Sequence, residues 1–551
     1  PIALLVLTFM FGALGGIVVP LLFAAVSIPT TLGFVWIAAN LMNMAAYVQN
    51  IVTLIGLAIA IDYSMLVVFR YREELARGVE PGPALERTMA TAGRATIFSG
   101  LTVAVGLALL AFMPLPFMQS MGVGGLLVPL VSIAASATFL PALLSVLGPR
   151  VNRFRIPFMR GILARRAAGE GGAWTRLAHS IMRRPWRYAI GAAAVMLALA
   201  APAVGLHLNG AGNSTVPPGT EAGDGQHLLE RALGPGALAP NQVAIDYGRA
   251  GGALAPAART AERRLVASLR ADREIQARTV LAPVVLPAAR ARAANLLDPI
   301  GQAVQIRAAG RHEAGAPSSV DLVHRIRRAY VPGAGFPPGA RVYVTGAPAF
   351  GVDFQATAYG AFPWLVVAVL VVSYLLLLRA FRSVVLPAKA VLMNLLSVGA
   401  TYGVLVLVFQ HGVGKAIGLA STPQIEAWIP IFLFAMLFGL SMDYEVFLLS
   451  RVREEWDARK DNEHAVAYGL EHTGRIITAA AIIMIAAFSG FLAGSFVGLQ
   501  EFGLGLAAAI LLDATVVRAL LVPAAMKLLG RWNWWLPERV RRVMRLAPSS
   551  T

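Results

Sequence analysis

Two stretches of the chain repeat each other, and each places an aspartate inside an otherwise apolar run. Asp62-Tyr63 and Asp443-Tyr444 each precede an Arg-x-Arg-Glu-Glu segment at the same spacing. An ionised aspartate in the hydrocarbon core of a membrane costs at least about 2.5 kcal/mol on insertion scales. Because this cost is met twice, the repeat predicts a functional role for both carboxylates and favours proton-coupled transport.

The composition excludes a soluble globular protein. Of 551 residues, 57% are hydrophobic and 14% charged, and the mean hydropathy is +0.67. The net charge of +18 is one-sided, since residues 150–187 carry ten arginines against Glu170 alone. Such a distribution follows the positive-inside rule and indicates cytoplasmic loops near anionic inner-leaflet lipid rather than nucleic acid. The chain has no cysteine, so disulfides and thiolate metal sites are excluded.

Apolar runs of about twenty residues, the length needed to cross a bilayer, predict eleven membrane spans. They lie near residues 2–19, 20–39, 46–69, 95–113, 121–147, 188–206, 359–378, 384–409, 427–449, 476–495 and 502–528. The arginine-rich loops place residues 150–187 and the C-terminal tail in the cytoplasm. An odd number of spans then places residue 1 outside.

The repeat divides these spans into two parallel halves of five aligned helices. Adding 381 carries Asp62 to Asp443, and adding 370 carries Ser27 to Ser397. The span at 188–206 has no partner in this alignment. Because the chain also begins inside an apolar run without Met, we expect that a matching helix precedes Pro1 and that the chain is a fragment.

Residues 207–357 form the one long polar segment between spans, and the topology places it outside the cytoplasm. Its pattern predicts strands at 242–245, 278–286, 303–306 and 342–345 and helices at 256–270 and 320–330. This order, βαββαβ, is typical of a small split βαβ module.

The expected organisation is therefore a polytopic α-helical membrane protein with one extracytoplasmic α/β domain. Its predicted parts are a first transmembrane half without its first helix (1–148), a basic cytoplasmic linker (149–187), a helix that opens the second half (188–206), the external domain (207–357), the second transmembrane half (358–530) and a cytoplasmic tail (531–551).

Asp62 and Asp443 lie about 12 Å from the cytoplasmic interface at 1.5 Å per residue, which is near mid-membrane. Desolvation disfavours the charged form of a carboxyl, so each group can take up and release a proton. Tyr63 and Tyr444 follow directly, and each hydroxyl reaches the opposite carboxylate if the two repeat helices face each other. The alternative is a buried carboxylate that only bonds helices together, with the tyrosines as packing or interface residues.

Three further charged residues lie inside the second half. Glu445 is either a third titratable site or a residue facing a water-filled cavity. Asp513 and Arg518 are five residues apart, an imperfect pair on an α-helix, so a mutual pair and inter-helix partners are both open. No histidine falls inside a predicted span, and the sequence suggests no metal site and no cofactor.

Several cytoplasmic features have simpler structural interpretations. The two Arg-x-Arg-Glu-Glu runs are interpreted as interface anchors. Gly93-Arg94 and Gly474-Arg475 are expected to hold the next helix against them. Residues 173–186 place Trp174 and its apolar neighbours on one face, which predicts a helix lying on the inner leaflet or an ordinary surface helix.

With these features together, the chain resembles the MMPL (mycobacterial membrane protein large) family of the resistance-nodulation-division (RND) superfamily. The resemblance rests on the two Asp-Tyr repeats with their charged runs, on Gly346-Ala347-Pro348 before Val352-Asp353-Phe354, and on residues 512–518. It implies a twelve-helix pseudo-twofold bundle with two external porter-type domains in the plasma membrane. It also implies that Asp62, Tyr63, Asp443 and Tyr444 form a proton relay for export of lipids or other hydrophobic molecules.

Two alternatives stay open at this stage. Drug or amphiphile efflux is not separable from lipid export by sequence. A non-transporting scaffold, like the sterol-sensing relatives of the superfamily, is disfavoured because it gains nothing from two costly carboxylates. The sequence does not define the substrate or the oligomeric state.

Overall fold

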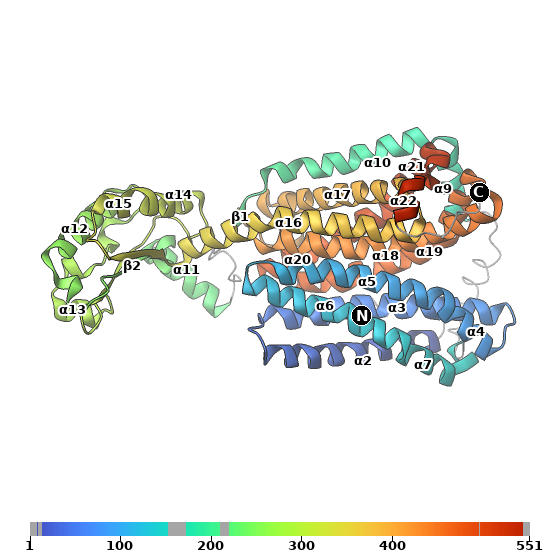
Figure 1. The fold of residues 1–551 in the computed structure, drawn as a ribbon, viewed down its shortest axis with the longest axis horizontal. Coiled ribbons are helices and arrows are strands. Elements are labelled where there is room, and N and C mark those ends of the chain that lie inside the picture. The colour runs from blue at the N-terminus through green and yellow to red at the C-terminus, as the bar shows by residue number, and fades with distance from the viewer. Residues whose placement is uncertain (1–7, 9–13, 153–171, 210–219, 495, 544–551) are drawn as a thin grey trace.

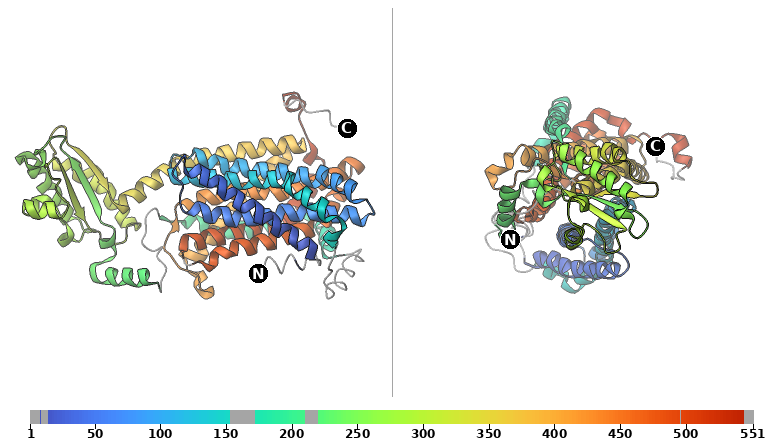
Figure 2. Two further views of the ribbon diagram at one scale, coloured as in Figure 1. Left: turned by 90° about the horizontal axis from the view of Figure 1, so that it is seen from below. Right: turned by 90° about the vertical axis from the view of Figure 1, so that its left-hand side faces the viewer.

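The computed structural model describes residues 8, 14–152, 172–209, 220–494 and 496–543. Within this part of the chain, ten helical segments are long and apolar enough to cross a membrane. They span Gly15–Ala39, Tyr47–Ala76, Pro81–Phe112, Pro116–Asn152, Pro185–Gly205, Ala347–Phe381, Val385–Gln410, Trp428–Arg459, Asn462–Ala493 and Val497–Trp534. The helices form one bundle, and the small α/β domain lies at one end of its long axis (Figures 1 and 2).

One predicted break between spans is wrong. Helix α2 runs without interruption over Leu14–Ala39, so residues on both sides of the expected break at 19 and 20 belong to one helix. Pro20 and Pro29 both lie inside it. Proline is tolerated in membrane helices because neighbouring groups satisfy the freed carbonyl. The rest of the predicted span 2–19 lies outside the described residues.

The two halves repeat in space as well as in sequence. Helix α5 (Arg94–Ala108) packs on α18 (Trp428–Arg459), and α3 (Tyr47–Ala76) packs on α19 (Asn462–Phe488). Adding 381 to the span 81–112 gives 462–493, the observed bounds of its counterpart. Adding 381 carries α3 to α18 and α5 to α19, so the two contacts exchange when the halves are exchanged, as expected for a pseudo-twofold relation between the helices that carry Asp62 and Asp443. Figure 1 shows these helices side by side with the rest of the bundle.

Two glycines allow the central helices to approach closely. A Cβ atom on Gly106 of α5 would lie 2.9 Å from the Ala435 carbonyl oxygen, and one on Gly439 of α18 would lie 2.9 Å from the Cα of Val103. Larger side chains at either position would force the backbones apart. Because Gly439 lies one turn before Asp443, this contact fixes the part of α18 that carries the second repeat motif.

The outer helices complete the bundle on either side. Helices α2 and α6 (Pro116–Ala137), followed by α7 (Phe139–Leu147), flank the first half, and α10 (Pro185–Ala200), α16 (Ala347–Phe381) and α17 (Val385–Leu405) flank the second (Figure 1). Helix α10 exposes large apolar side chains, namely Trp186, Ile190, Val195 and Leu197. Exposed apolar surface on this scale is expected where a helix faces lipid.

The external domain holds a three-stranded antiparallel sheet in the order β3-β2-β4. Its strands are β2 (Asn241–Asp246), β3 (Ala303–Ala308) and β4 (Arg341–Thr345), with Val243 opposite Ile306 and Val344. Helices α12 (Pro256–Ala271) and α14 (Pro317–Arg325) pack with the sheet around one core.

The predicted strand at 278–286 is wrong. It is replaced by short 3-10 turns and a single bridge from Leu281 to Arg307. Pro283, which has no N–H to donate, lies in the second of these turns. The domain boundary expected at 357/358 falls inside α16, which runs from the domain into the bundle as one helix.

The amphipathic segment at 173–186 forms helix α9 (Ala173–Arg183) and the start of α10. Its apolar face does not lie free for lipid. Ala178 and Ile181 are buried, and a Cβ on Gly474 of α19 would lie 2.5 Å from the ring of Trp174. Helix α9 therefore covers the N-terminal half of α19, and Gly474 provides the space for Trp174.

Candidate functional site

The first predicted pair lies in the middle of α3. Asp62 is 8% exposed and Tyr63 3% exposed, and the Ser99 hydroxyl of α5 donates to the Tyr63 hydroxyl oxygen at 3.4 Å. Both side chains line a small pocket. Its other walls come from α3 (Leu66), α5 (Ala95, Thr96 and Ser99) and α18 (Val446 and Phe447). A titratable group inside the membrane thus borders empty space.

The second predicted pair lies on α18, the pseudo-twofold partner of α3. The backbone of Asp443 and Tyr444 is helical, but their side chains lie outside the described part of the structure. Val446 and Phe447 follow one turn later on the same helix and line the Asp62 pocket. The two repeat helices therefore meet at this pocket, while pairing of each tyrosine with the opposite carboxylate stays a prediction.

A second, larger pocket adjoins the first on the side of the charged helix ends. It shares the walls Leu66, Ala95, Val446 and Phe447 with the Asp62 pocket. Its far walls carry Arg70, Glu73, Arg451 and Glu454 from the two repeat runs, and Arg94 from the start of α5. The Arg-x-Arg-Glu-Glu segments, interpreted from sequence as anchors, thus also border the space below Asp62.

Asp513 and Arg518 form a mutual ion pair, with 2.6 Å between Arg518 Nη2 and Asp513 Oδ2. Both residues are buried, and Arg518 is 3% exposed. On an α-helix, residues five apart differ by about 140° in direction. Here Asp513–Leu521 form a π-helix, in which hydrogen bonds join residues five apart. The wider turn therefore allows the pairing that sequence reasoning left open.

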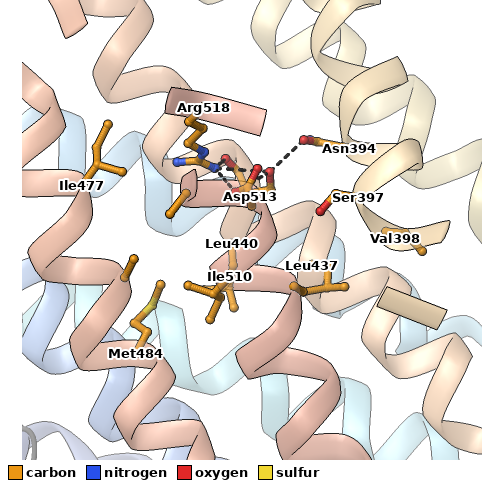
Figure 3. Close-up of a pocket in the computed structure, with 14 residues that line it drawn as sticks. Asn394, Ser397, Val398, Leu437, Leu440, Ile477, Met484, Ile510, Asp513 and Arg518 are labelled. Carbon is orange, nitrogen blue, oxygen red and sulfur yellow. Dashed lines mark hydrogen bonds and ion pairs between the residues drawn. The ribbon is translucent and has the colours of Figure 1, made fainter. Parts of the chain in front are cut away.

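The same pair also reaches other helices. The Ser441 hydroxyl of α18 donates to Asp513 Oδ2 at 3.1 Å and contacts Asn394 Oδ1 of α17 at 2.7 Å. Arg518 donates to the Ser441 carbonyl. These residues border a small pocket between α17, α18, α19 and α20 (Val497–Leu512), with the charged groups gathered at one side (Figure 3). Asp513 and Arg518 therefore form both the mutual pair and the inter-helix contacts that the sequence left open.

Glu445 faces a lysine that sequence analysis missed. Lys389 of α17 and Glu445 are both buried, and Nζ lies 3.9 Å from Glu445 Oε1. This distance is too long for a hydrogen bond, and Nζ has no hydrogen-bond acceptor among the described residues. A lone lysine inside the apolar run 384–409 was the available signal, since a charge in a membrane helix is seldom incidental. Asn394 and Ser441 gave no comparable signal.

The buried polar residues described above form a network that belongs to the second half only. Its members are Lys389, Asn394, Ser441, Glu445, Asp513 and Arg518. Subtracting 381 or 370 carries its members to small or apolar residues, namely Ala60 (Ser441), Ser64 (Glu445), Ser132 (Asp513), Ala137 (Arg518), Val19 (Lys389) and Ala24 (Asn394). The halves share the Asp-Tyr motif and differ in what lies behind it. Among the described residues, no group of three or more His, Asp or Glu side chains is arranged to hold a metal ion.

The fold and the site define a polytopic helical membrane protein built from two parallel repeats, with a small α/β domain at one end of the bundle and buried charges inside the bundle. A sequence profile of the MMPL family matches residues 1–188 and 216–549, so the chain belongs to that family.

Several of its curated relatives are longer mycobacterial proteins. The heme uptake protein MmpL11 of Mycobacterium tuberculosis is 37% identical over 550 residues, covering 99% of this chain and 54% of the relative. The mycolic acid-containing lipids exporter MmpL11 of Mycolicibacterium smegmatis is 36% identical over 553 residues, covering 99% and 55%. The trehalose monomycolate exporter MmpL3 of the same species is 32% identical over 572 residues, covering 98% and 54%. The chain spans about half the length of these relatives.

Proposed function

We propose that this protein exports lipids or other hydrophobic molecules across the bacterial inner membrane and is driven by the proton motive force. One observation carries the proposal. Asp62, buried in a membrane-length helix beside Tyr63, lines a small pocket that adjoins a larger pocket walled by Arg70 and Arg451. A carboxyl group in this position can exchange a proton with the cytoplasmic side, whereas one packed tightly between helices cannot.

The repeat supports a relay of four residues, Asp62, Tyr63, Asp443 and Tyr444, in which two carboxylates share the central space. The network of Asp513, Arg518 and Glu445 then serves as an accessory, since a nearby charge pair biases the protonation of a carboxylate on the same helix bundle. Its restriction to one half makes the two carboxylates inequivalent. A relay with a preferred order of protonation needs such a difference.

The substrate class follows from the relatives. Two of them are named for lipid export, and a third for heme uptake. Lipid and heme are both large and mainly apolar, so the shared chemistry is a hydrophobic molecule. Drug or amphiphile efflux is the alternative within transport. A non-transporting scaffold is disfavoured, because it does not require a titratable group beside a cavity. Anionic inner-leaflet lipid is the proposed contact of the basic loops.

The proton gradient is expected to control transport. The protein is reconstituted in vesicles, and movement of a fluorescent lipid is followed with and without an imposed pH difference. We expect transport under the gradient and a fall to background when a protonophore collapses it, because the relay can do work only when protons flow. Vesicles at equal pH on both sides are the control. Equal rates with and without a gradient would exclude proton coupling.

The orientation in the membrane is testable because the chain has no cysteine. Ala294 lies exposed on the external domain, and Ala458 lies exposed at the opposite end, near the end of α18. We expect Ala294→Cys to react with a membrane-impermeant maleimide in intact cells, and Ala458→Cys to react only after permeabilisation. Each variant is the control for the other. Reversed labelling would overturn the proposed topology.

A further inference from the structure

A loop at residues 420–427 joins the membrane bundle to the external domain. Strand β5 (Ile425–Glu426) in this loop pairs in parallel with β1 (Leu208–Asn209), the segment through which the chain leaves the bundle. Gln424 donates from Nε2 to the carbonyl oxygen of Gly315, which belongs to the external domain, at 2.7 Å. Movement of this junction loop therefore pulls on both the domain and the chain that enters it.

Helix α20 holds the junction loop through Glu501. This residue is 1% exposed. Its Oε2 accepts the N–H of Glu426 at 3.0 Å, and its Oε1 accepts the Thr422 hydroxyl at 3.4 Å. The neighbouring Gln500 accepts the N–H of Ala420 through Oε1 at 3.4 Å. The loop thus has three points of attachment to one helix, and two of them are on a single carboxyl group.

The first half of the protein provides an internal comparison. Adding 381 carries Ser120 to Glu501 and Ala45 to Glu426. The Ser120 hydroxyl accepts the N–H of Ala45 at 3.2 Å, so the same backbone group is held at the matching position. A neutral hydroxyl is therefore sufficient to hold this N–H. The second half replaces the serine and the alanine with two carboxyl groups, which are costly to bury when charged.

We call Glu426 and Glu501 the outer acidic pair. Their surroundings provide little to offset the cost of burying a charged carboxyl group. Among the described residues, no Lys, Arg or His lies within ion-pair distance of either carboxyl. The other titratable groups at the loop are Tyr47 of α3, which lies near Glu426, Tyr359 of α16, which donates to the Ala427 carbonyl at 2.9 Å, and His207, whose carbonyl accepts the N–H of Ile425 at 2.8 Å. Burial raises the pKa of Glu426. A carboxyl group adds one property that serine lacks, namely exchange of a proton.

We propose that the outer acidic pair binds a proton from the external side and thereby controls how firmly α20 holds the junction loop. When Glu501 is ionised, its bonds to the Glu426 N–H and the Thr422 hydroxyl are charge-assisted and strong. Two adjacent carboxyl groups in a dry site do not ionise together without cost, so the pair holds one proton readily. A second proton neutralises Glu501 and weakens both bonds. The loop then loosens, and the external domain gains freedom to move.

This inference rests on the proposed proton-driven transport, for which it supplies a link between proton binding and the external domain. Glu501 is a positioning residue, since it acts through the loop and not on the substrate. The Asp62 relay lies deeper in the bundle, so the two sites are separable by experiment.

The test is hydrogen–deuterium exchange of residues 420–427 in the detergent-solubilised full protein without any gradient. Protection factors, in which the intrinsic pH dependence of exchange is divided out, are compared between about pH 5.5 and about pH 8.5. We expect the parent loop to lose protection by roughly tenfold at the lower pH. Glu501→Gln, which keeps an acceptor but cannot ionise, should show low protection at both values.

Two further variants keep the test decisive. Ser120→Ala, the matched change in the first half, should leave the pH response of the loop intact. Glu426→Gln should shift or remove the response, and it replaces Glu501→Gln if that variant does not fold. A parent loop with constant protection, or a Glu501→Gln loop that keeps the parent response, overturns the proposal. A normal loop response together with gradient-independent transport would instead refute the proton-driven transport alone.

Discussion

Asp62→Asn is expected to reduce gradient-driven transport by about 100-fold or more, the scale of losing a group that transfers protons. The carboxamide keeps the shape of the side chain but does not exchange a proton. Because Asp62 borders a cavity and is not packed on all sides, insertion and folding should stay near the parent level. Transport is measured in reconstituted vesicles, and folding is followed by gel filtration of the solubilised protein.

The matched control is Asp457→Asn, the same change at an exposed position near the C-terminal end of α18. It should transport at the parent rate, because Asp457 pairs with Arg453 at the surface. If Asp62→Asn also transports at the parent rate, Asp62 is not part of the relay. If the variant is lost before it folds, Asp62 is instead a structural residue that bonds helices together.

Arg518→Met is expected to destabilise the protein by about 3–5 kcal/mol, because it leaves the buried Asp513 carboxylate without its counter-charge. The double variant Asp513→Leu with Arg518→Met removes both charges and should recover most of the loss. Unfolding in mixed micelles, followed by denaturant titration, measures both. Recovery of stability without recovery of transport would show that the pair functions beyond holding the helices.

The surface pair of Arg459 and Glu455 is the control for this cycle. Arg459 Nε lies 2.6 Å from Glu455 Oε1, but Arg459 is exposed at the end of α18. Arg459→Met should change stability by less than about 1 kcal/mol, since solvent screens such pairs. An Arg518→Met effect as small as the Arg459→Met effect would mean that water reaches Asp513 and that the site is not dry.

The differences between the halves place a limit on how far the repeat can be extrapolated. Ser64 and Ser132, the first-half counterparts of Glu445 and Asp513, are buried but not ionisable. The shared Asp-Tyr motif therefore has two different environments. If both carboxylates belong to one relay, we expect the variants Asp62→Asn and Asp443→Asn to differ in how they alter its pH dependence.

Most helices of the bundle were predictable because the hydrocarbon core of a membrane restricts the backbone to few structures. Every backbone polar group in hydrocarbon must be satisfied within its own segment, so a long apolar run has to be a helix. This requirement does not say where one long apolar run divides into spans, and the break expected at 19 and 20 falls inside α2. It does not apply in the external domain, where the expected strand at 278–286 depended on pairing that Pro283 opposes.

The amino-acid sequence was sufficient to identify the residues that carry charge into the membrane and the two copies of one helical unit. Both features can be recognised by comparing residues along the chain. The contacts between the charged residues became known from the three-dimensional structure. Lys389 meets Glu445 and Asp513 meets Ser441 across helices, and Asp513 meets Arg518 through a π-helical turn. Such pairings depend on helix rotation and pitch, which are set by packing between helices and are not encoded locally.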